Sequence, residues 1–425
     1  MKTAPLLRRV TAAEITRLGT ALSDRETHDA ADAIVAAVQN EGETAVRRYA
    51  EKFEERRPGE PLVLGRAEMQ RALDALDVDD RSALERAALR IEHFTQAQRS
   101  AISELTIRIP GGEAGHTIEP VESAGCYAPA GRYPLPSSVL MTAITARVAG
   151  CARVVVASPG AHPVALAAAA IADADEFLAV GGPHAIAAMA YGFAGFPRCD
   201  VIAGPGNKWV TAAKHIVSSV VGIDMLAGPS ELLVLADETA DAACVAADLL
   251  AQAEHDVDAV PMLITTSQRI ADAVEAELCR QLEVLATEST ARQALARGFV
   301  HINAHLEACI KLVDALAPEH LEVMTENATE VAGRIRNAGA MFIGPLSAEV
   351  VGDYGAGPNH TLPTGGSARF RAGLSVMHFI RLRTWMRIDD ATAAQELFED
   401  THRLATIEGL AGHAVSVQQR IGPRD

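Results

Sequence analysis

Aromatic residues are scarce in this sequence, since Phe, Trp and Tyr together make up only 4% of its 425 residues. The hydrophobic core must therefore be built mainly from Ala, Val, Leu and Ile, which suits helices packed closely against parallel strands. A chain of this length exceeds what one hydrophobic core usually supports, so we expect two or more domains. The fractions of hydrophobic (49%) and charged (22%) residues are those of an ordinary globular protein.

Basic residues are also in deficit. The chain carries 38 Lys and Arg against 55 Asp and Glu, which gives a formal net charge of −17. A protein this acidic repels nucleic acid and anionic membranes. The short run Arg381-Leu382-Arg383, with Arg387 nearby, carries too little positive charge to outweigh this net negative charge. We therefore expect neither nucleic acid nor membrane as a partner.

Long apolar runs and paired cysteines are absent from the sequence. No run of about 18 apolar residues exists, so no membrane span is predicted, and residues 1–9 contain no apolar signal core. None of the six cysteines forms a Cys-x-x-Cys pair, so the spacing indicates neither a disulfide framework nor a zinc ribbon. A reducing cytoplasm is the expected compartment.

The usual nucleotide-binding fingerprints, Gly-x-Gly-x-x-Gly after a strand and Walker A, are missing as well. In their place, Gly204-Pro205-Gly206-Asn207 follows a predicted strand and opens a predicted helix. Such a turn presents free N–H groups to an anion, although it also fits a tight turn without a ligand. Tyr127 begins a second turn, where its ring could stack on a planar ligand if exposed, or pack into the core.

Alternating strands and helices dominate the chain after residue 120, whereas residues 1–120 appear helical and charged. The first series has strands at 152–157, 176–180 and 200–203, with helices at 163–174, 185–191 and 209–220. The second has strands at 232–236, 261–265, 299–302, 320–324 and 340–343, with helices at 240–255, 268–285, 304–315 and 328–337. Such alternation predicts two α/β units with parallel sheets.

Gln252 and His255 lie three residues apart in the predicted helix 240–255, so their side chains leave the same face. An amide oxygen and an imidazole placed in this way can hold a divalent metal. Further ligands would have to come from elsewhere in the chain or from another chain. Taken alone, the pair is more typical of a surface helix with an unrelated His.

Glu319 and His320 place a carboxylate beside an imidazole where a loop enters the predicted strand 320–324. Adjacent strand residues point to opposite faces, so both reach one pocket only if the junction bends. The His could then accept a proton near neutral pH while the Glu steers a water. Without such a bend, the pair is an ordinary strand start.

A long loop rich in Gly and Pro, residues 352–366, contains Asp353 and His360. Loops of this length in a compact domain are usually functional or disordered, and the few charges here favour an ordered site. Near the C-terminus, Glu408 and His413 add another carboxylate and imidazole. His413 fits equally well as a surface residue in a tail.

Several short motifs occur in order along the chain and together closely resemble histidinol dehydrogenases. They are Ile223-Asp224-Met225-Leu226-Ala227-Gly228-Pro229-Ser230-Glu231, Gln252-Ala253-Glu254-His255, Ala317-Pro318-Glu319-His320-Leu321, Gly352-Asp353-Tyr354, Gly357-Pro358-Asn359-His360, and Glu408-Gly409-Leu410 with His413. Each motif is weak alone, but their common order over residues 30–420 excludes chance.

The resemblance implies an α/β fold of two Rossmann-like parallel-sheet units side by side, with small N- and C-terminal segments, as in the aldehyde dehydrogenase-like architecture of this family. We expect residues 1–25 to form an N-terminal helical segment. Residues 26–120 and 231–373 are expected to form the first α/β domain, with the zinc and catalytic residues. Residues 121–230 are expected to form the second, which contacts NAD, and residues 374–425 to reach the partner subunit.

The resemblance also implies a zinc-dependent homodimer that oxidises L-histidinol to L-histidine, through histidinaldehyde, with two NAD, in the last step of histidine biosynthesis. The implied zinc ligands are Gln252, His255, Asp353 and His413, the last donated by the partner subunit. Amide, carboxylate and imidazole ligands are reasonable for zinc. The metal would orient the substrate rather than generate a hydroxide nucleophile.

By the same resemblance, His320 takes the alcohol proton and Glu319 activates water on the aldehyde. The implied substrate-binding residues are Ser230, Gln252, His255, His320, Asp353, Glu408 and His413, with His360 nearby. The implied NAD contacts are Tyr127, His184 and Asn207.

The chain departs from the family pattern near these NAD contacts. His184 stands where the family often has Gln, and Ala130 where it commonly has Gly. The pair Arg132-Tyr133 also occurs in relatives that oxidise sulfonated diols. The first alternative is therefore a paralogue acting on another polar alcohol such as a sulfopropanediol. Two further alternatives are a zinc hydrolase that uses metal-bound hydroxide without NAD, and a two-lobed binding protein without catalysis.

Overall fold

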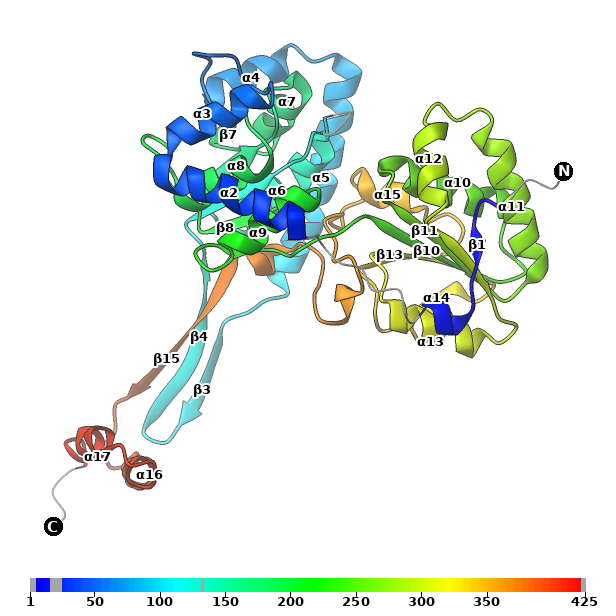
Figure 1. The fold of residues 1–425 in the computed structure, drawn as a ribbon. Helices are drawn as coiled ribbons and strands as arrows, with labels where there is room; N and C mark the ends of the chain where they lie inside the picture. The colour runs from blue at the N-terminus through cyan, green and yellow to red at the C-terminus, as the bar shows by residue number, and fades with distance from the viewer. Residues whose placement is uncertain (1–4, 16–24, 131–133, 422–425) are drawn as a thin grey trace. The chain divides into compact units, whose positions relative to one another are not determined.

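The computed structural model describes residues 5–15, 25–130 and 134–421. The chain forms two compact units (Figure 1): unit 1 comprises Met1–Ala97 and Val121–Phe379, and unit 2 comprises Gln98–Pro120 and Ile380–Asp425. Unit 1 contains two six-stranded sheets, and unit 2 contains one sheet of three strands. Within the described residues, no helix is long and apolar enough to cross a membrane.

The first sheet belongs to a part of unit 1 that we call lobe 2, residues 5–15 and 231–353. Its six strands are all parallel, in the order β1-β12-β11-β10-β13-β14. They are β1 (Arg8–Arg9), β10 (Glu231–Ala236), β11 (Val260–Thr265), β12 (Phe299–Ile302), β13 (His320–Met324) and β14 (Ala340–Ile343). The predicted parallel sheet is confirmed, and β12, β13 and β14 have the predicted bounds.

Helices cover both faces of this sheet. They are α1 (Ala12–Ile15), α10 (Ala242–His255), α11 (Gln268–Leu282), α12 (Glu288–Leu295), α13 (Leu306–Leu316), α14 (Ala328–Ala332) and α15 (Glu349–Asp353). Alternate residues of β10 serve opposite cores: Leu232 and Val234 pack with α10, α11 and α12, whereas Leu233 and Leu235 pack with α13 and α14. Burial on both faces explains why these strands read as continuous apolar runs.

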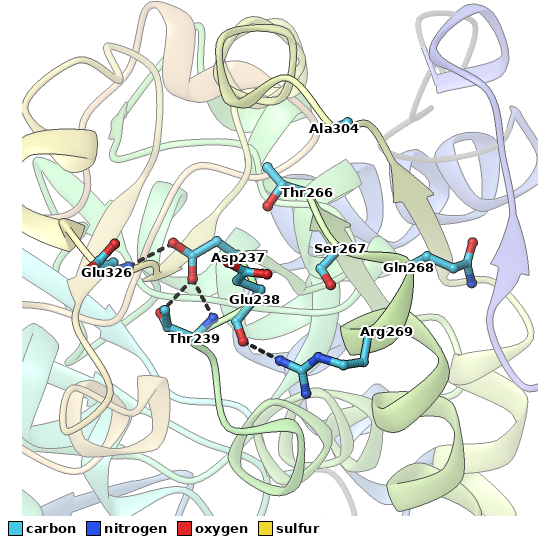
Figure 2. A pocket seen from close by; sticks show the side chains of 9 residues that line it. All are labelled: Asp237, Glu238, Thr239, Thr266, Ser267, Gln268, Arg269, Ala304 and Glu326. Carbon is cyan, nitrogen blue, oxygen red and sulfur yellow. Dashed lines mark hydrogen bonds between the residues drawn. The ribbon is translucent and has the colours of Figure 1, made fainter.

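A cavity of about 550 Å³ opens at the carboxyl ends of the lobe 2 strands. Figure 2 shows its lining residues, which are Asp237, Glu238, Thr239, Thr266, Ser267, Gln268, Arg269, Ala304 and Glu326. The side chain of Asp237 is occupied within the protein, because its oxygens accept from Thr239 and from the backbone of Glu326. No residue singled out in the sequence lies in this cavity.

The second sheet belongs to lobe 1, residues 25–97 and 121–230. Its strand order is β2-β7-β6-β5-β8-β9, and only β2 is antiparallel to its neighbour. The strands are β2 (Val63–Gly65), β5 (Ser123–Tyr127), β6 (Arg153–Ala157), β7 (Glu176–Leu178), β8 (Val201–Ala203) and β9 (Gly222–Ile223). The helices are α2 (Arg25–Glu41), α3 (Glu43–Lys52), α4 (Arg66–Asp74), α5 (Val78–Ser100), which continues into unit 2, α6 (Pro136–Ala149), α7 (Pro163–Ile171), α8 (Gly182–Tyr191) and α9 (Lys208–Val217).

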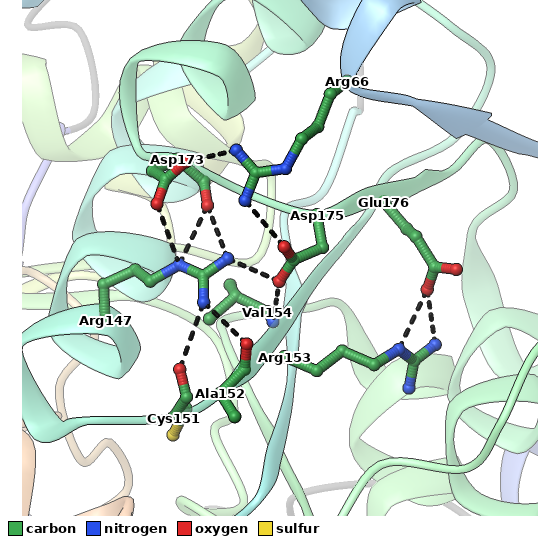
Figure 3. A network of polar contacts seen from close by, with 9 residues as sticks. All are labelled: Arg66, Arg147, Cys151, Ala152, Arg153, Val154, Asp173, Asp175 and Glu176. Atoms are coloured by element: carbon green, nitrogen blue, oxygen red, sulfur yellow. Dashed lines mark hydrogen bonds and ion pairs between the residues drawn. The ribbon is translucent and has the colours of Figure 1, made fainter.

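A network of arginines and aspartates ties α4 and α6 to the turn before β7 (Figure 3). Arg66 pairs with Asp173 and, at 2.7 Å, with Asp175. Arg147 pairs with the same two aspartates. Burial alone would raise the pKa of Asp175, but the Val154 amide and both guanidinium groups outweigh it and lower that pKa. The network therefore fastens residues of the N-terminal third to the sheet of residues 121–230.

The predicted grouping of residues 26–120 with residues 231–373 is wrong. Strand β2 pairs with β7, and α2 and α3 share a core with α8 and α9, so residues 25–97 complete lobe 1. The N-terminal strand β1 instead joins lobe 2 through β12. An amphipathic helix shows in its sequence that one face is buried, but not against which sheet, and two- or three-residue strands leave little signal.

Unit 2 was also mispredicted in part, because residues 105–120 form strands rather than helix. Strand β4 (Gly112–Pro120) pairs antiparallel with β3 (Leu105–Ile109) and with the nine-residue β15 (Ile380–Ile388). Two short 3₁₀ turns, Ser367–Arg369 and Val376–His378, precede β15, and α16 (Gln395–Ile407) and α17 (Ala411–Gln418) follow it. A core of Ala394, Phe398 and Val417 holds the two helices together. This core is very small for a unit that folds alone.

Candidate active site

The predicted chemical residues of lobe 2 gather at the amino ends of its central strands. Glu231 is the first residue of β10 and His320 the first of β13. Helix α10 follows β10 and ends at His255, just before β11, so its last turn returns to the same edge. Short helix α15 contributes Asp353. Residues as far apart in sequence as Glu231 and Asp353 thus converge here.

His255 and Asp353 form the first pair of the site. The Nε2 atom of His255 lies 3.3 Å from Oδ2 of Asp353, while Nδ1 lies 3.0 Å from the carbonyl oxygen of Ala251 and donates to it. Burial lowers the pKa of His255, but the hydrogen bond and charge of Asp353 outweigh it and raise that pKa to about 9. Two ligands of one tetrahedral zinc lie about 3.3 Å apart, so the spacing fits a shared metal ion.

Gln252 is fully buried one turn before His255 in α10. Neither its amide oxygen nor its amide nitrogen has a hydrogen-bond partner among the described residues. Leaving a buried amide unpaired costs about 1–3 kcal/mol, so this side chain is expected to serve a group that the protein itself does not supply. An oxygen ligand to a metal satisfies that requirement.

His320 has a defined tautomer. Its Nδ1 atom lies 2.9 Å from the carbonyl oxygen of Glu231, which can only accept, so Nδ1 carries the proton. The Nε2 atom is buried and forms no hydrogen bond. Burial lowers the pKa of His320 to about 4, so the imidazole is neutral at pH 7 and presents a free lone pair on Nε2. This is the state that a general base requires.

Glu319 lies beside His320, as the predicted bend at the strand start requires. Its Oε2 atom accepts a 2.8 Å hydrogen bond from the backbone N–H of Glu231 and lies 3.7 Å from Nδ1 of His320. Burial raises the pKa of Glu319 well above its usual range. The backbone of one residue, Glu231, therefore positions both members of the predicted catalytic pair.

Glu349 is a residue of this site that the sequence analysis missed. It is 1% exposed, and its Oε1 lies 3.5 Å from Nε2 of His320. One donor atom from each of His320, Glu349 and Asp353 falls within 4.8 Å of the others. The signal was the four-residue spacing between Glu349 and Asp353, which places both on one helix face, but the segment resembled loop.

The site carries unusual negative charge. Its buried or largely buried carboxyl groups are Glu231, Asp248, Glu319, Glu322, Glu349 and Asp353. Among the described residues, no Lys or Arg forms an ion pair with any of them. Burial, followed by the charge of Asp248, raises the pKa of Glu322 to about 9. Burial also raises the pKa of Asp353, but the hydrogen bond of His255 outweighs it and the net result is a pKa of about 2. A divalent cation would offset this charge, so the donor set fits a metal.

His360 supports Asp353 rather than facing open space. Its Nδ1 atom lies 2.9 Å from the carbonyl oxygen of Asp353, and its Nε2 atom 3.2 Å from Oγ of Ser138 on α6. The neighbouring Asn359 donates to the carbonyl oxygen of Met141, also on α6. These contacts order the Gly- and Pro-rich loop, as its composition predicts.

The remaining predicted substrate residues lie in different places. Ser230 is half-buried directly before β10, and its carbonyl oxygen accepts from Val260. Glu408 and His413 belong to unit 2, where Glu408 ends α16 and His413 lies in α17, and both are exposed. Their proposed contacts with substrate and metal stay predictions.

Two of the predicted NAD residues are buried and already bonded. The hydroxyl of Tyr127 accepts from the backbone N–H of Gly182 at 3.1 Å, so this Tyr packs into the core. His184 is 1% exposed, and its Nε2 lies 2.8 Å from the carboxylate of Glu55. Glu55, which the sequence analysis missed, also accepts from the N–H of Gly181. At the start of α8, the N–H groups of Gly181 and Gly182 and the Nε2 atom of His184 are therefore already bonded to other residues of the protein. Arg132 and Tyr133 lie outside the described residues.

Asn207 differs, since it is exposed at the start of α9. Its Oδ1 atom caps the helix by accepting from the N–H groups of Trp209 and Val210. The turn before it lies where the chain order of the sheet reverses, between β5 and β8, which is where open α/β sheets bind ligands. Gly204 has φ +128°, and a Cβ there would lie 2.0 Å from the carbonyl oxygen of Tyr127. The close approach of these two strand ends therefore requires glycine.

Comparison with known proteins supports the assignment from the motifs. Residues 19–421 match the family model of histidinol dehydrogenase. The chain belongs to the histidinol dehydrogenase family. It is 44% identical over 420 residues to the histidinol dehydrogenase of Parasynechococcus marenigrum (strain WH8102), which covers 96% of this chain and 94% of that protein. It is 41% identical to the Methanosarcina mazei protein of that name, covering 98% of this chain and 97% of the other.

A solved structure agrees with these sequence matches. The crystal structure of histidinol dehydrogenase from Elizabethkingia anophelis aligns with a TM-score of 0.92 and 32% identity over 98% of each chain. The predicted fold class is therefore confirmed, as is the class of enzyme, an NAD-dependent oxidoreductase of the histidinol dehydrogenase family.

Proposed function

We propose that this protein is a zinc-dependent histidinol dehydrogenase that oxidises L-histidinol to L-histidine, through histidinaldehyde, with two NAD, as the last step of histidine biosynthesis. The observation that carries the proposal is the neutral, buried imidazole of His320, held beside Glu319 and next to the His255–Asp353 pair. Relatives named histidinol dehydrogenase at 41–44% identity support the substrate.

His320 is proposed to accept the hydroxyl proton of histidinol on Nε2. Because Nδ1 donates to the carbonyl oxygen of Glu231, only Nε2 can take that proton, and the ring cannot flip without breaking this 2.9 Å bond. NAD, when bound, would supply the acceptor for the hydride that leaves the same carbon. The C–H and O–H bonds break together with formation of the carbonyl group, so the alcohol loses two electrons.

Glu319 is proposed to remove a proton from water as that water adds to the aldehyde. Its fixed position, set by the N–H of Glu231, keeps it beside the same carbon. A carboxylate with a raised pKa is a stronger base than an ordinary one. The hydrate then loses a second hydride to a second NAD, and water supplies the new carboxylate oxygen. Three protons leave the site in total.

The metal would be held by Gln252, His255 and Asp353 of this chain and by His413 of the partner subunit. When bound, zinc would bind the nitrogen atoms of histidinol and so orient the substrate with its alcohol carbon beside His320. The unpaired amide of Gln252 and the 3.3 Å spacing of His255 and Asp353 support these ligands. A site completed in this way requires a homodimer.

NAD is proposed to bind lobe 1 at the carboxyl ends of β5 and β8. Asn207 is an exposed polar residue there, and Tyr127 and His184 form hydrogen bonds to the segments around Gly182 and Glu55. Because both side chains are hydrogen-bonded within the protein, we expect them to support the backbone that forms the cofactor site rather than to be exposed to solvent. The cysteines at all six positions are free thiols, in keeping with the cytoplasm proposed from their spacing.

The decisive experiment follows NADH formation by purified protein with L-histidinol, with histidinaldehyde and with a sulfopropanediol. Two NADH per histidinol, lost on chelation and restored by zinc, would support the proposal. Turnover of the sulfonated diol without turnover of histidinol would make the protein a paralogue. Hydrolytic activity without NAD would assign it to a different class of zinc enzyme.

A further inference from the structure

The carboxylate of Glu349 is buried beside two groups, the like-charged Asp353 and the Nε2 atom of His320 at 3.5 Å. It is 1% exposed, and neither of its oxygens forms a hydrogen bond to a described residue. The nearest charged neighbour on its own helix is the like-charged Asp353. A buried, unpaired carboxylate is strongly unfavourable, so its retention points to a partner that arrives from outside the chain.

The position of Glu349 is fixed by the fold. Its backbone N–H donates to Oε1 of Glu322 at 2.8 Å, which ties the start of α15 to strand β13. Its side chain shares one face of α15 with Asp353, four residues later. Because Asp353 already meets Nε2 of His255 at 3.3 Å, the carboxylate of Glu349 is delivered to the edge of the same cluster.

The spacing suits one metal ion. Donor atoms of Glu349, Asp353 and His320 lie within 4.8 Å of one another, and ligands of a single ion lie about 3–4 Å apart. Closing that difference requires a shift of the Glu349 side chain. The surrounding carboxyl groups have no Lys or Arg as ion-pair partner among the described residues, so a bound cation would offset negative charge that no Lys or Arg there offsets.

We propose that Glu349 is a further ligand of the metal held by Gln252, His255 and Asp353, and that it binds the ion while histidinol is absent. The identity of the metal as zinc rests on the proposed function. Histidinol offers two nitrogens and therefore needs two coordination positions. A carboxylate that occupies one of these positions in the free enzyme is displaced when substrate arrives, and its Oε1 then faces Nε2 of His320, 3.5 Å away in this structure.

The test measures zinc affinity by competition with a chelator, without any assay of activity. Glu349→Gln preserves the shape of the side chain and removes its charge. Since loss of a residue that only supports a metal ligand weakens metal binding about 10–100-fold, loss of a carboxylate ligand is expected to weaken it by at least about 10-fold. Glu330→Gln, on the exposed face of α14, is the matched control and should bind zinc as the wild type does. Equal zinc affinity of the Glu349→Gln variant and the wild type would overturn the proposal.

Substrate provides a second readout. With saturating histidinol, the difference in zinc affinity between Glu349→Gln and wild type should shrink, because both proteins then use the nitrogens of the substrate. An undiminished difference would show that Glu349 is not displaced, and would overturn that part of the proposal. The cobalt-substituted protein gives the same comparison by visible absorption: the variant should differ from wild type without histidinol and match it with histidinol.

Thermal unfolding separates a metal ligand from a merely structural residue. In the chelated protein, the melting temperature of each protein gives its baseline without metal. Zinc should then raise the melting temperature of Glu349→Gln less than that of wild type, because the variant has one ligand fewer. An equal rise in the two proteins, as expected if Glu349 only shares a proton with Asp353, would refute the role. If the wild type itself fails to bind zinc or to oxidise histidinol, the proposed function is at fault instead.

Discussion

Replacing Glu231 with Gln should change how folding stability depends on pH. Glu231 is buried at the start of β10, and its Oε1 accepts from the N–H of Gly365 at 3.1 Å. Burial raises the pKa of this carboxyl from 4.5 to about 7, although hydrogen bonds from backbone amides act in the opposite direction. The folded protein therefore holds this proton more tightly than the unfolded chain does.

The sign and size of the effect follow from that difference in pKa. The contribution of Glu231 to stability is fully present below pH 4.5 and is lost as the pH rises through about 7. Since one unit of pKa corresponds to about 1.4 kcal/mol, the full loss is about 3 kcal/mol. Between about pH 5 and pH 9 the wild type should lose about 2–3 kcal/mol through this group, whereas the Gln variant has no proton to lose.

The assay is urea unfolding of both proteins at these two pH values, with a chelator present so that metal binding does not contribute. The free energy of unfolding of Glu231→Gln, relative to wild type, should improve by about 2–3 kcal/mol from the lower to the higher pH. The other titrating groups are common to both proteins and cancel, apart from Glu319, whose pKa the charge of Glu231 also raises. Glu330→Gln, at an exposed position, should show no such change. A constant difference between Glu231→Gln and wild type at the two pH values would refute the reasoning.

Three further predictions concern turnover. His320→Asn should slow the first hydride transfer about 10²–10⁴-fold, the usual worth of a general base, and an unchanged single-turnover rate with histidinol would contradict the assignment. Glu319→Gln should slow mainly the oxidation of histidinaldehyde, so that the aldehyde accumulates during turnover; equal losses in both oxidations would count against its role with water. His413→Ala should lose bound zinc and activity, yet mixing it with His320→Asn should restore one of the two sites in each mixed dimer, because an intact His413 then reaches the subunit with an intact His320. If mixing restores nothing, His413 is not exchanged between subunits.

The sequence was most informative where strands are buried on both faces. The predicted strands 232–236 and 261–265 fall within one residue of the bounds of β10 and β11, because a central parallel strand is buried on both faces and therefore has an unbroken run of apolar side chains. The first 120 residues lacked that signal. Strand β2 has three residues and β1 has two. The sequence of the helices around them shows that one face is buried, but not which sheet that face packs against. The domain grouping therefore failed there.

The candidate site divides along similar lines. Gln252, His255 and Asp353 were singled out because helix periodicity and a Gly-rich segment can be recognised in the sequence. The structure places side-chain atoms of His255 and Asp353 3.3 Å apart. Glu55 and Glu349 were missed because an acidic residue in a helix or loop is normally solvated, and only the fold reveals that Glu349 is buried and Glu55 largely covered. The role of His184 was obscured for the same reason, since its partner Glu55 is 129 residues away.

The register of the lobe 2 sheet explains why the site lies at the amino ends of the strands. Leu232 of β10 stands opposite His320 of β13, so the residue before Leu232 brings both its backbone groups to the catalytic pair. The carbonyl of Glu231 fixes the tautomer of His320, and its N–H fixes the carboxylate of Glu319. A slip of one residue would turn both side chains to the other face of the sheet. Because Leu232 and Leu233 are buried in opposite cores, such a slip would also disrupt both cores, so the packing that stabilises the sheet also holds the two proposed bases, His320 and Glu319, in place.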